Sequence, residues 1–486
     1  MEKIIVKNTC IEIPNYIFGD CPKLEKSLSI WDDRKHRYMA IGYDYSESKD
    51  TLYIPRGLDI EYVAKILNRV IEYDRDNRFR PNIANISLLT KPRDMDQVKG
   101  IRFLSGECEY DYTKNFSQKV LTLPPGIGKT YITIASLSIL RERAVIITHL
   151  DRIGSQWIES MKNFTKIDEN DIYDIKGSKD IDKLFKKYEE NNSLPYKLYF
   201  INHGTIHSYC SKNGWDKIDE LFRIMGVGIK VYDEAHLNFS NILLTDFHSN
   251  VKRTFYLTAT FRRSDPKQQK VFDLAFKNVI KFGIEKISEQ RKHLNYLVYK
   301  FNTHPSMGDQ LSLKSKRGFK VLAYFSYVIK KNNFYAGIEY LINSFNKLEG
   351  KILVLVGTIE ACEFLYDKFC DEFSSKKVTK VHSKAKVDRV EAFNGDLIVS
   401  TPQSFGTGVD VDNIRVCINT VPYSSTVTAD QVSGRLRPIN DIDNSVYIEM
   451  VDVGFDQVNK MYKKRKKFLI DKCDKSFIIK ERVLYK

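Results

Sequence analysis

The stretch Leu123-Pro-Pro-Gly-Ile-Gly-Lys-Thr130 restricts the possible folds more than any other part of the sequence. A short apolar run, residues 120–123, precedes it, and a largely apolar segment, residues 131–140, follows it. Strand, glycine-rich loop and helix in this order are typical of a phosphate-binding loop. Backbone N–H groups and the positive end of the helix would hold the phosphates. The first glycine of the usual pattern is replaced by Leu123.

The loop residues predict an ATP and Mg²⁺ site. Gly126 and Gly128 belong to the loop that would contact the phosphates. Lys129 would reach the β- and γ-phosphates, and the hydroxyl of Thr130 would hold Mg²⁺.

An acidic pair later in the chain suits the same site. The apolar run 229–232 leads into Asp233-Glu234-Ala235-His236. Asp233 can hold Mg²⁺ through a water molecule, and Glu234 can polarise the water that attacks the phosphate. An acidic pair at the end of a strand is common by itself. A phosphate loop followed later in the chain by such a pair is uncommon.

Strands and helices alternate around these motifs and predict an α/β fold. The strands expected in this region are 120–123, 144–148, 197–202, 229–232 and 254–257. Such alternation predicts a parallel sheet with its site at the carboxyl edge. Gln97, at the end of the stretch 92–97, either reads the adenine edge or only begins a surface helix.

Further motifs follow in a fixed order. Thr258-Ala-Thr260 closes the strand 254–257, and a second series of strands and helices begins near residue 351. That series contains the stretches 401–410 and 430–438. Together with the phosphate loop and Asp-Glu-Ala-His, these stretches resemble motifs I, II, III, V and VI of superfamily 2 helicases of the D-E-A-H type.

The resemblance implies two tandem RecA-like lobes and a nucleic-acid-stimulated ATPase, with ATP bridging the lobes. Thr258 and Thr260 would couple the nucleotide state to lobe movement, and His236 would join that coupling. Gly408 and Asp410, in the stretch that looks like motif V, would contact the nucleotide.

The stretch that looks like motif VI departs from the family pattern. Gln431 and Arg435 would share a helical face, with Gln431 on the nucleotide and Arg435 on the γ-phosphate as an arginine finger. The second arginine of the pattern is Pro438 here. Arg437 would lie about 200° around the helix from Arg435. Either Pro438 ends the helix and Arg437 swings in, or only one finger is used.

Three domains are expected: a small α+β domain, 1–88, and lobes 89–300 and 301–486, with the polar segment 303–320 as the linker. In the first domain, Asp59 should cap a helix whose apolar face continues to Val70 and Ile71. Its Arg56 either touches phosphates or belongs to a solvated loop.

The net charge of +15 favours a polyanionic partner, although basic residues can also form a solvated surface. A basic run near the C-terminus is expected to lie along a duplex backbone or to form a solvated helix face. Its residues are Lys463, Lys464, Arg465, Lys466 and Lys467.

The sequence predicts a monomeric, cytoplasmic protein, in a host cell if it is viral. No run approaches the ~18 apolar residues of a membrane span, residues 1–20 lack the apolar core of a signal peptide, and the scattered cysteines suggest reduced, packed thiols.

In plan, the chain is similar to compact phage and viral helicases of the UvsW branch-migration type, and also to poxviral transcript-release helicases. The leading hypothesis is an ATP-driven translocase on branched DNA, such as forks, Holliday junctions and R-loops, in viral or phage replication, recombination or repair. The alternatives are an RNA–DNA or transcript-release helicase and, in a different class, a non-catalytic ATP-gated nucleic-acid clamp.

Overall fold

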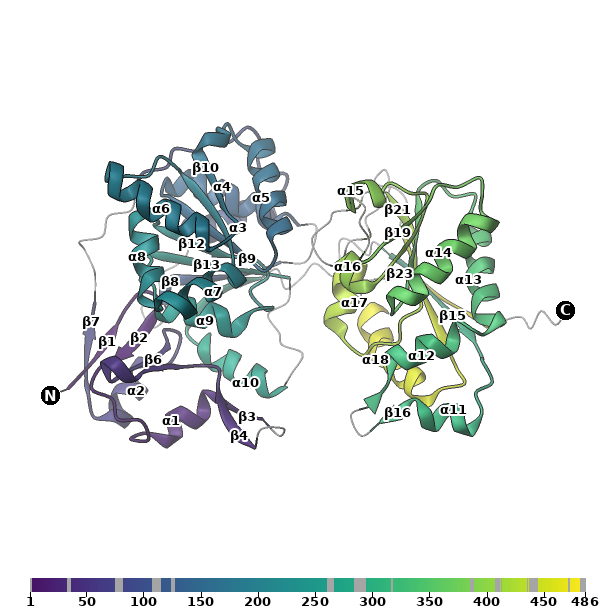
Figure 1. Cartoon of the computed structure of the whole chain (residues 1–486), viewed down its shortest axis with the longest axis horizontal. Coiled ribbons are helices and arrows are strands. Elements are labelled where there is room, and N and C mark those ends of the chain that lie inside the picture. The colour runs from purple at the N-terminus through teal and green to yellow at the C-terminus, as the bar shows by residue number, and fades with distance from the viewer. Residues whose placement is uncertain are drawn as a thin grey trace. The chain divides into compact units, whose positions relative to one another are not determined.

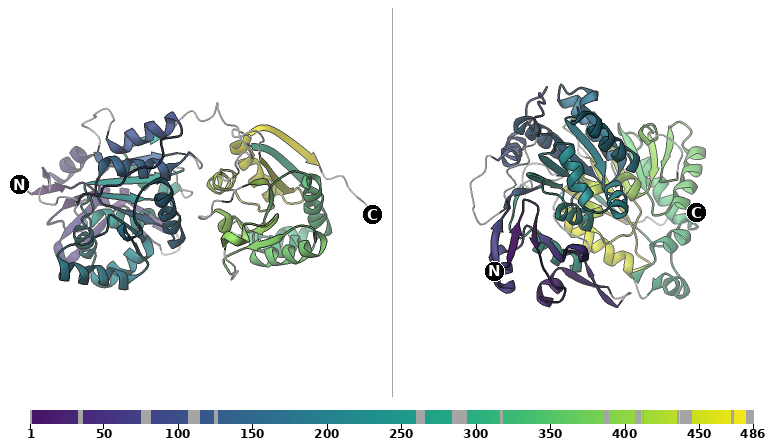
Figure 2. Two further views of the ribbon diagram at one scale, coloured as in Figure 1. Left: turned by 90° about the horizontal axis from the view of Figure 1, so that it is seen from above. Right: turned by 60° about the vertical axis from the view of Figure 1, so that its left-hand side comes forward.

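The computed structural model divides into two compact units, Met1–Ile284 and Glu285–Lys486, each with its own seven-stranded sheet (Figures 1 and 2). The described residues are 2–32, 36–74, 82–106, 115–123, 127–259, 266–283, 294–315, 318–384, 389–406, 411, 413–434, 436, 445–470 and 473–480. This confirms the predicted α/β fold with two sheets.

The sheet of the first unit has the order β10-β11-β9-β12-β13-β8-β14, and its described pairings are parallel. Because the strands run in one direction, their carboxyl ends meet at one edge, where open α/β sheets bind ligands. Its strands are β8 (Asn115–Thr122), β9 (Ala144–Thr148), β10 (Ile172–Ile175), β11 (Leu198–Asn202), β12 (Ile229–Tyr232), β13 (Arg253–Thr258) and β14 (Val279–Gly283).

Helices cover both faces of this sheet, because its strands are apolar on both sides. Ile146 and Val231 pack into the core of one face, whereas Val145 and Tyr232 pack into the core of the other. The first face is covered by α3 (Met95–Ser105), α4 (Lys129–Leu140) and α5 (Asp151–Phe164). The second is covered by α6 (Ser178–Asn191), α7 (His203–Asn213), α8 (Asp216–Ile224), α9 (Phe239–Phe247) and α10 (Pro266–Ala275).

The N-terminal part has the predicted α+β character, with a mixed five-stranded sheet in the order β5-β6-β2-β1-β7 and a hairpin β3–β4. It shares one core with α9 and α10, so it packs as part of the first unit. A Cβ at Gly57 would lie 2.2 Å from the carbonyl oxygen of Ala275 in α10. Its elements are β1 (Lys3–Val6), β2 (Cys10–Ile13), α1 (Pro22–Ser27), β3 (Ser29–Asp32), β4 (Arg37–Ala40), β5 (Asp44–Ser46), β6 (Thr51–Pro55), α2 (Ile60–Leu67) and β7 (Val70–Tyr73).

Helix α2 is shorter than its sequence predicts. Asp59 caps it as expected, by accepting a hydrogen bond from the helix backbone. The chain then leaves the helix at Asn68, which has a left-handed φ of 51°, a conformation that asparagine tolerates. Val70 and Ile71 therefore lie in strand β7 and not on the helix.

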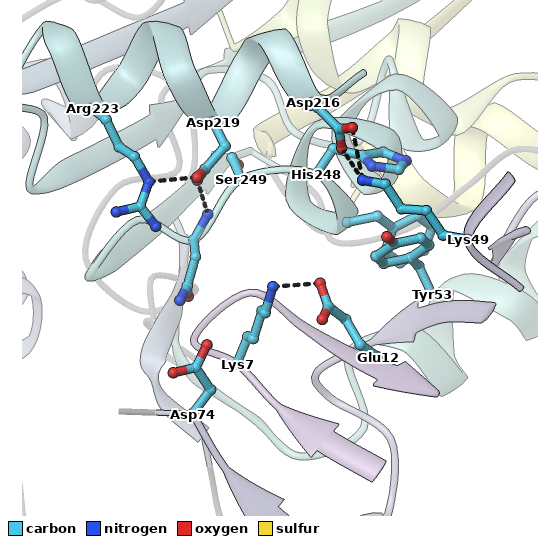
Figure 3. A pocket seen from close by; sticks show the side chains of 12 residues that line it. Lys7, Glu12, Lys49, Tyr53, Asp74, Asp216, Asp219, Arg223, His248 and Ser249 are labelled. Carbon is cyan, nitrogen blue, oxygen red and sulfur yellow. Dashed lines mark hydrogen bonds and ion pairs between the residues drawn. The ribbon is translucent and has the colours of Figure 1, made fainter. Parts of the chain in front are cut away.

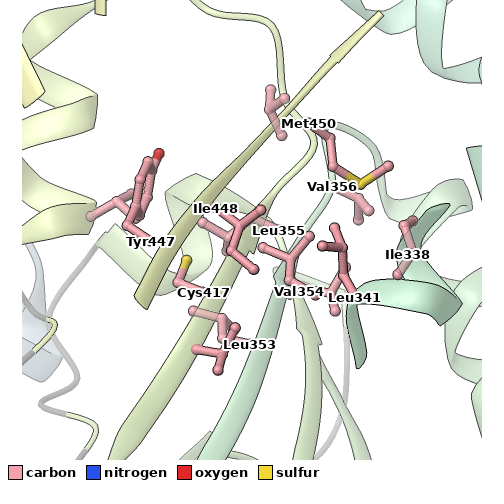
Figure 4. Close-up of a cluster of buried hydrophobic side chains, with 14 of the residues drawn as sticks. Ile338, Leu341, Leu353, Val354, Leu355, Val356, Cys417, Tyr447, Ile448 and Met450 are labelled. Atoms are coloured by element: carbon pink, nitrogen blue, oxygen red, sulfur yellow. The ribbon is translucent and has the colours of Figure 1, made fainter. Parts of the chain in front are cut away.

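The sheet of the second unit has the order β19-β20-β18-β21-β22-β15-β23, again with parallel described pairings. Figure 4 shows part of its core, in which Val354 of β18 lies beside Leu341 of α13, whereas Leu353 lies on the other side of the strand with Cys417. The strands are β15 (Leu294–Phe301), β18 (Lys351–Leu355), β19 (Val378–Val381), β20 (Leu397–Ser400), β21 (Ile414–Asn419), β22 (Ser445–Asp452) and β23 (Cys473–Lys480). Its helices include α12 (Val321–Val328), α13 (Asn332–Phe345), α14 (Ile359–Glu372), α15 (Arg389–Ala392), α16 (Pro402–Gly406), α17 (Thr426–Ser433) and α18 (Asp456–Ile470).

The boundary between the units lies earlier than predicted. Strand β15 pairs with β22 and β23, so the second unit already includes residues 294–301. The segment 303–320, expected to be a linker, lies inside this unit and contains α11 (Met307–Ser312) and the short strands β16 (Lys314–Ser315) and β17 (Gly318–Phe319). A capping box between Ser306 and Asp309 begins α11, so polar composition here marks a helix start.

The described cysteines are free thiols, and all except Cys370 are buried. Among the described helices, none has the length and apolar character needed to cross a bilayer.

Candidate nucleotide site

The phosphate loop leads from β8 into α4 as the sequence predicts. Gly128 caps the helix with a φ of +95°, which glycine adopts without strain. The ammonium of Lys129 donates a hydrogen bond of 2.9 Å to the carbonyl oxygen of Leu123, at the start of the loop. Thr130 is half-buried in the first turn of α4, and Gly126 lies outside the described residues.

Gln97 is buried against the phosphate loop. Its Oε1 accepts a hydrogen bond of 2.8 Å from the backbone N–H of Arg93, and its Nε2 donates one of 3.0 Å to the carbonyl oxygen of Ile127. A Cβ at Gly128 would lie 2.6 Å from this Nε2. A helix does start here, since Asp94 caps α3 by accepting a hydrogen bond from the N–H of Gln97, but the Gln97 side chain is buried and joins α3 to the loop; its contact with adenine stays a prediction. One of its amide hydrogens is left for another acceptor.

Backbone hydrogen bonds bring the motifs together at the carboxyl edge of the sheet. The N–H of Leu123 donates to the carbonyl oxygen of Thr258 at 3.1 Å. The N–H of Asp233 donates to Ile147 at 3.0 Å, and that of Ala235 donates to Leu257 at 2.9 Å. The strands that precede the phosphate loop, the acidic pair and Thr258 thus end side by side.

The carboxylate of Asp233 is held on both sides. Its Oδ2 accepts a hydrogen bond of 2.8 Å from the indole N–H of Trp157 in α5, and its Oδ1 accepts one of 2.9 Å from the backbone of Glu234. Burial raises the pKa of Asp233, and the Glu234 carboxylate adds to the rise, whereas Trp157 and Lys129 oppose it. Sequence reasoning missed Trp157, because nothing in its local sequence shows that α5 lies against the end of β12.

Glu234 occupies a backbone conformation that is unusual for a residue with a side chain. Its φ is +48°, a left-handed value that costs roughly 1 kcal/mol or more outside glycine. Such outliers gather at functional sites. Its Oε2 is buried, receives no hydrogen bond from the described residues, and lies 3.3 Å from Nδ1 of His236.

The structure brings His236 and Thr258 into contact. His236 is buried, and its Nδ1 lies 2.9 Å from the hydroxyl oxygen of Thr258. The imidazole therefore touches both the acidic pair and the end of β13. Thr260 lies outside the described residues.

Two more histidines, not expected from the sequence, follow the neighbouring strands. His149 comes directly after β9, burial lowers its pKa, and neither of its ring nitrogens has a hydrogen-bond partner among the described residues. His203 comes directly after β11, stacks on Tyr232 with ring centroids 5.7 Å apart, and burial lowers its pKa to about 3. Both rings are therefore neutral near pH 7.

The residues at this edge fit a magnesium–nucleotide complex. Mg²⁺ in such sites takes one or two carboxylates together with phosphate oxygens and water, and Thr130 and Asp233 offer that donor set. The buried Glu234 Oε2 leaves an acceptor for a water molecule. No cluster of three or more His, Cys, Asp or Glu that could hold a metal alone occurs in the described parts of the chain.

A separate polar cavity of about 190 Å³ lies where the N-terminal sheet meets α8 and α9 (Figure 3). Lys49 pairs with Asp216 at 2.7 Å, and Arg223 pairs with Asp219 at 2.5 Å. The pair between Lys49 and Asp216 joins the N-terminal part to α8, and the lining holds three basic and four acidic side chains.

Gly408, Asp410, Arg435 and Arg437 lie outside the described residues. Gln431 is part of α17, but its side chain is not described.

The basic run on α18 is not uniform. Lys463, Lys464 and Lys467 are exposed and Lys466 is half-buried, whereas Arg465 is 1% exposed. Arg465 pairs with the equally buried Glu449 through its Nε at 2.5 Å. Its predicted role as a nucleic-acid contact is wrong, because the guanidinium points into the core.

Arg56 is half-buried in the turn after β6, and burial lowers the pKa of its guanidinium. Its contact with phosphates stays a prediction.

Comparison with known proteins finds relatives whose names fit a nucleotide-dependent enzyme acting on nucleic acid. The family described as "Type III restriction enzyme, res subunit" matches residues 77–263. The "Transcript termination protein A18" of Yaba-like disease virus is 22% identical over 387 residues, covering 76% of this chain and 74% of the viral protein. The "DNA 3'-5' helicase XPB" of Kineococcus radiotolerans is 24% identical over 160 residues, 33% of this chain and 26% of that protein.

Solved structures show the fold. S. cerevisiae Dbp5 bound to RNA and ADP BeF3 matches with a TM-score of 0.52 and 14% identity, over 81% of this chain and 90% of that chain. T4 UvsW aligns over 99% of both chains with 14% identity and a TM-score of 0.39. The match to Dbp5 shows that the two parallel sheets have the fold of tandem RecA-like lobes. The chain is thus similar in sequence to viral proteins and to a DNA helicase, in agreement with the resemblance to superfamily 2 helicases.

Proposed function

We propose that this chain is an ATP-driven translocase that acts on branched DNA. The observation that carries the proposal is the meeting of Lys129, Asp233, Glu234 and Thr258 at one sheet edge, with a buried Glu234 oxygen beside them. These residues form the parts of an ATPase that couples turnover to movement.

Each residue has a distinct role in the proposed reaction. Lys129 would leave the Leu123 carbonyl and bind the β- and γ-phosphates. Thr130 and Asp233 would hold Mg²⁺, which neutralises phosphate charge when bound. Glu234 would orient and polarise the attacking water.

The remaining candidates complete the proposal. Gln97 would offer its free amide hydrogen to the adenine, and the contact between His236 and Thr258 would pass the nucleotide state to β13. Arg435 would stabilise charge on the transferred phosphoryl group. The other proposed nucleotide or coupling residues are Gly126, Gly128, Thr260, Gly408, Asp410, Gln431 and Arg437.

Nucleic acid is the proposed partner for two reasons. The charge of +15 favours a polyanion, and α18 exposes Lys463, Lys464 and Lys467. The relative from Kineococcus radiotolerans is a DNA helicase, and the structure of Dbp5 that matches this fold was solved bound to RNA. Branched DNA is favoured because the N-terminal part shares a core with the first lobe and so adds a fixed surface for a second arm of a junction.

A second candidate function is transcript release. It is supported by the match to a viral transcript termination protein over 76% of this chain. The ATPase site would be the same, and only the nucleic-acid substrate would differ. The non-catalytic clamp is disfavoured because Lys129 and Glu234 are both present.

Strand separation on four substrates, assayed side by side, tests the proposal. Forked DNA, a Holliday junction, an R-loop and duplex RNA would be offered at equal concentration, with Lys129→Ala as the inactive control. The proposal predicts ATP-dependent activity on forks and junctions above that on duplex RNA. Preference for duplex RNA, or activity confined to the RNA–DNA hybrid, would contradict it.

A further inference from the structure

The β3–β4 hairpin of the N-terminal part presents two aromatic rings to solvent. Trp31 and Tyr38 lie directly opposite each other in the antiparallel register, so both project from the same face. Their ring centroids are 5.1 Å apart at 73°. Trp31 is 40% exposed and Tyr38 is 53% exposed. Large rings left in water at the tip of a short sheet suggest a surface that receives a partner.

The charge around this hairpin suits a polyanion. Arg37 is exposed beside Tyr38, and the described residues of α1 and α10 add further cations. The described basic side chains of the hairpin and these two helices are Lys23, Lys26, Arg37, Lys267 and Lys270; the acidic ones are Glu25, Asp32 and Asp273, of which Glu25 is buried. Proteins hold unpaired nucleic acid with aromatic rings, on which the bases stack, and with cations, which contact the backbone.

The hairpin is fixed to the helix that follows Thr258 in the chain. The ammonium of Lys267 in α10 donates a hydrogen bond of 3.2 Å to the carbonyl oxygen of Trp31. Gly42, just after β4, lies so close to α10 that a Cβ there would be 2.6 Å from Cγ1 of Val271. Figure 1 shows the hairpin beside α10. In the chain, α10 follows β13, the strand whose Thr258 touches His236.

We propose that Trp31 and Tyr38 form a stacking platform for unpaired bases where a duplex opens. This deepens the proposed function and rests on the nucleic-acid binding that it includes. The platform holds separated bases without reading their sequence, because every base has an aromatic face. A protein partner is disfavoured by the cations around the rings.

Equilibrium binding of fluorescent oligonucleotides, without ATP, tests the platform. The probes are a single-stranded DNA and a blunt duplex of the same sequence. The variants are Trp31→Ala, Tyr38→Ala, the double variant, and the conservative Trp31→Phe. Tyr62→Ala is the matched control, because Tyr62 is 44% exposed in the same N-terminal part but lies on α2. Thermal unfolding of each variant checks that it folds.

The double variant should bind single-stranded DNA about tenfold or more weakly, with little change for the blunt duplex. Trp31→Phe should recover most of the affinity, and Tyr62→Ala should behave as wild type. Unchanged single-strand affinity in the folded double variant overturns the platform but leaves the proposed function standing, and would assign the rings to a protein partner. Equal losses on both probes also overturn it. If the wild type binds neither probe, the proposed function itself fails.

Discussion

The indole Nε1 of Trp157 donates a hydrogen bond of 2.8 Å to Oδ2 of Asp233, the first carboxylate of the Asp-Glu-Ala-His stretch. Since the backbone N–H of Glu234 occupies the other oxygen, the carboxylate has one orientation. Trp157 thus acts as a positioning residue: it does not touch the nucleotide but fixes the group that would hold Mg²⁺.

Trp157→Phe should weaken Mg²⁺-dependent nucleotide binding about fivefold, because it removes a hydrogen bond to a charged group worth roughly 1 kcal/mol or more. A phenyl ring keeps part of the packing but leaves a small cavity where the larger indole was, so the melting temperature should fall by only a few degrees. Titration with an ADP analogue, with and without Mg²⁺, measures this. An equal loss in both titrations would mean that Trp157 supports the fold and not the Mg²⁺ ligand.

Arg465 should prove to be a core residue. Arg465→Ala leaves the buried Glu449 carboxylate without its partner, and breaking such a pair costs about 3–5 kcal/mol. For a unit of this size the melting temperature should fall by about 10 °C. Lys466→Ala, one residue along the same helix, is the control and should shift it little. Equal melting temperatures for the two variants would contradict the assignment.

The exposed lysines of α18 should act on binding and not on stability. Neutralising Lys463, Lys464 and Lys467 together should weaken DNA binding and lower the salt slope by about one for each lysine that contacts a phosphate. ATP hydrolysis without DNA should stay at the wild-type rate. Binding isotherms between low and physiological salt measure this, and an unchanged slope would show that these lysines are only solvated.

The burial of Arg465 could have been predicted from the sequence, because the helical period places it on a different face of α18 from the other basic residues of the run. Val458, Tyr462 and Leu469 are buried on α18, and position 465 falls on their stripe at spacings of three and four. The prediction from the sequence considered only that the five residues are basic, and so it placed all of them on one exposed face. The burial of Glu449, its partner, depends on β22 lying beneath α18 and could not be read from local sequence.

Elsewhere in the fold, too, local patterns were predictable from the sequence, whereas contacts between distant segments were not. The phosphate loop, the acidic pair and the strands around them were predictable, because βα units with motifs at strand ends leave few arrangements. The contacts of His149, His203 and Trp157 were not, since they depend on which strands become neighbours. The left-handed φ of Glu234 has no local signal either, because glutamate rarely adopts it.

Motif VI offers a prediction that rests on sequence. Proline at 438 has no charge and no N–H, and it disfavours helical geometry at Arg437. Arg435 should therefore carry most of the charge stabilisation, and Arg435→Ala should lower ATP turnover by about 10³ while DNA affinity stays nearly intact. Arg437→Ala should lower ATP turnover only on the order of tenfold, since Arg437 lies on a different face of the helix from Arg435. Rates at saturating DNA decide this, and a reversed order would move the finger to Arg437.

The most direct measurement is ATP turnover by Glu234→Gln with and without forked DNA, alongside wild type and Lys129→Ala. Wild type should hydrolyse ATP faster when DNA is added, and Lys129→Ala should be inactive. Glu234→Gln should still bind ATP, because Lys129 and Asp233 remain, but its turnover should fall by at least about a hundredfold. Full DNA-stimulated turnover in purified Glu234→Gln would contradict the account, because another group would then have to polarise the attacking water.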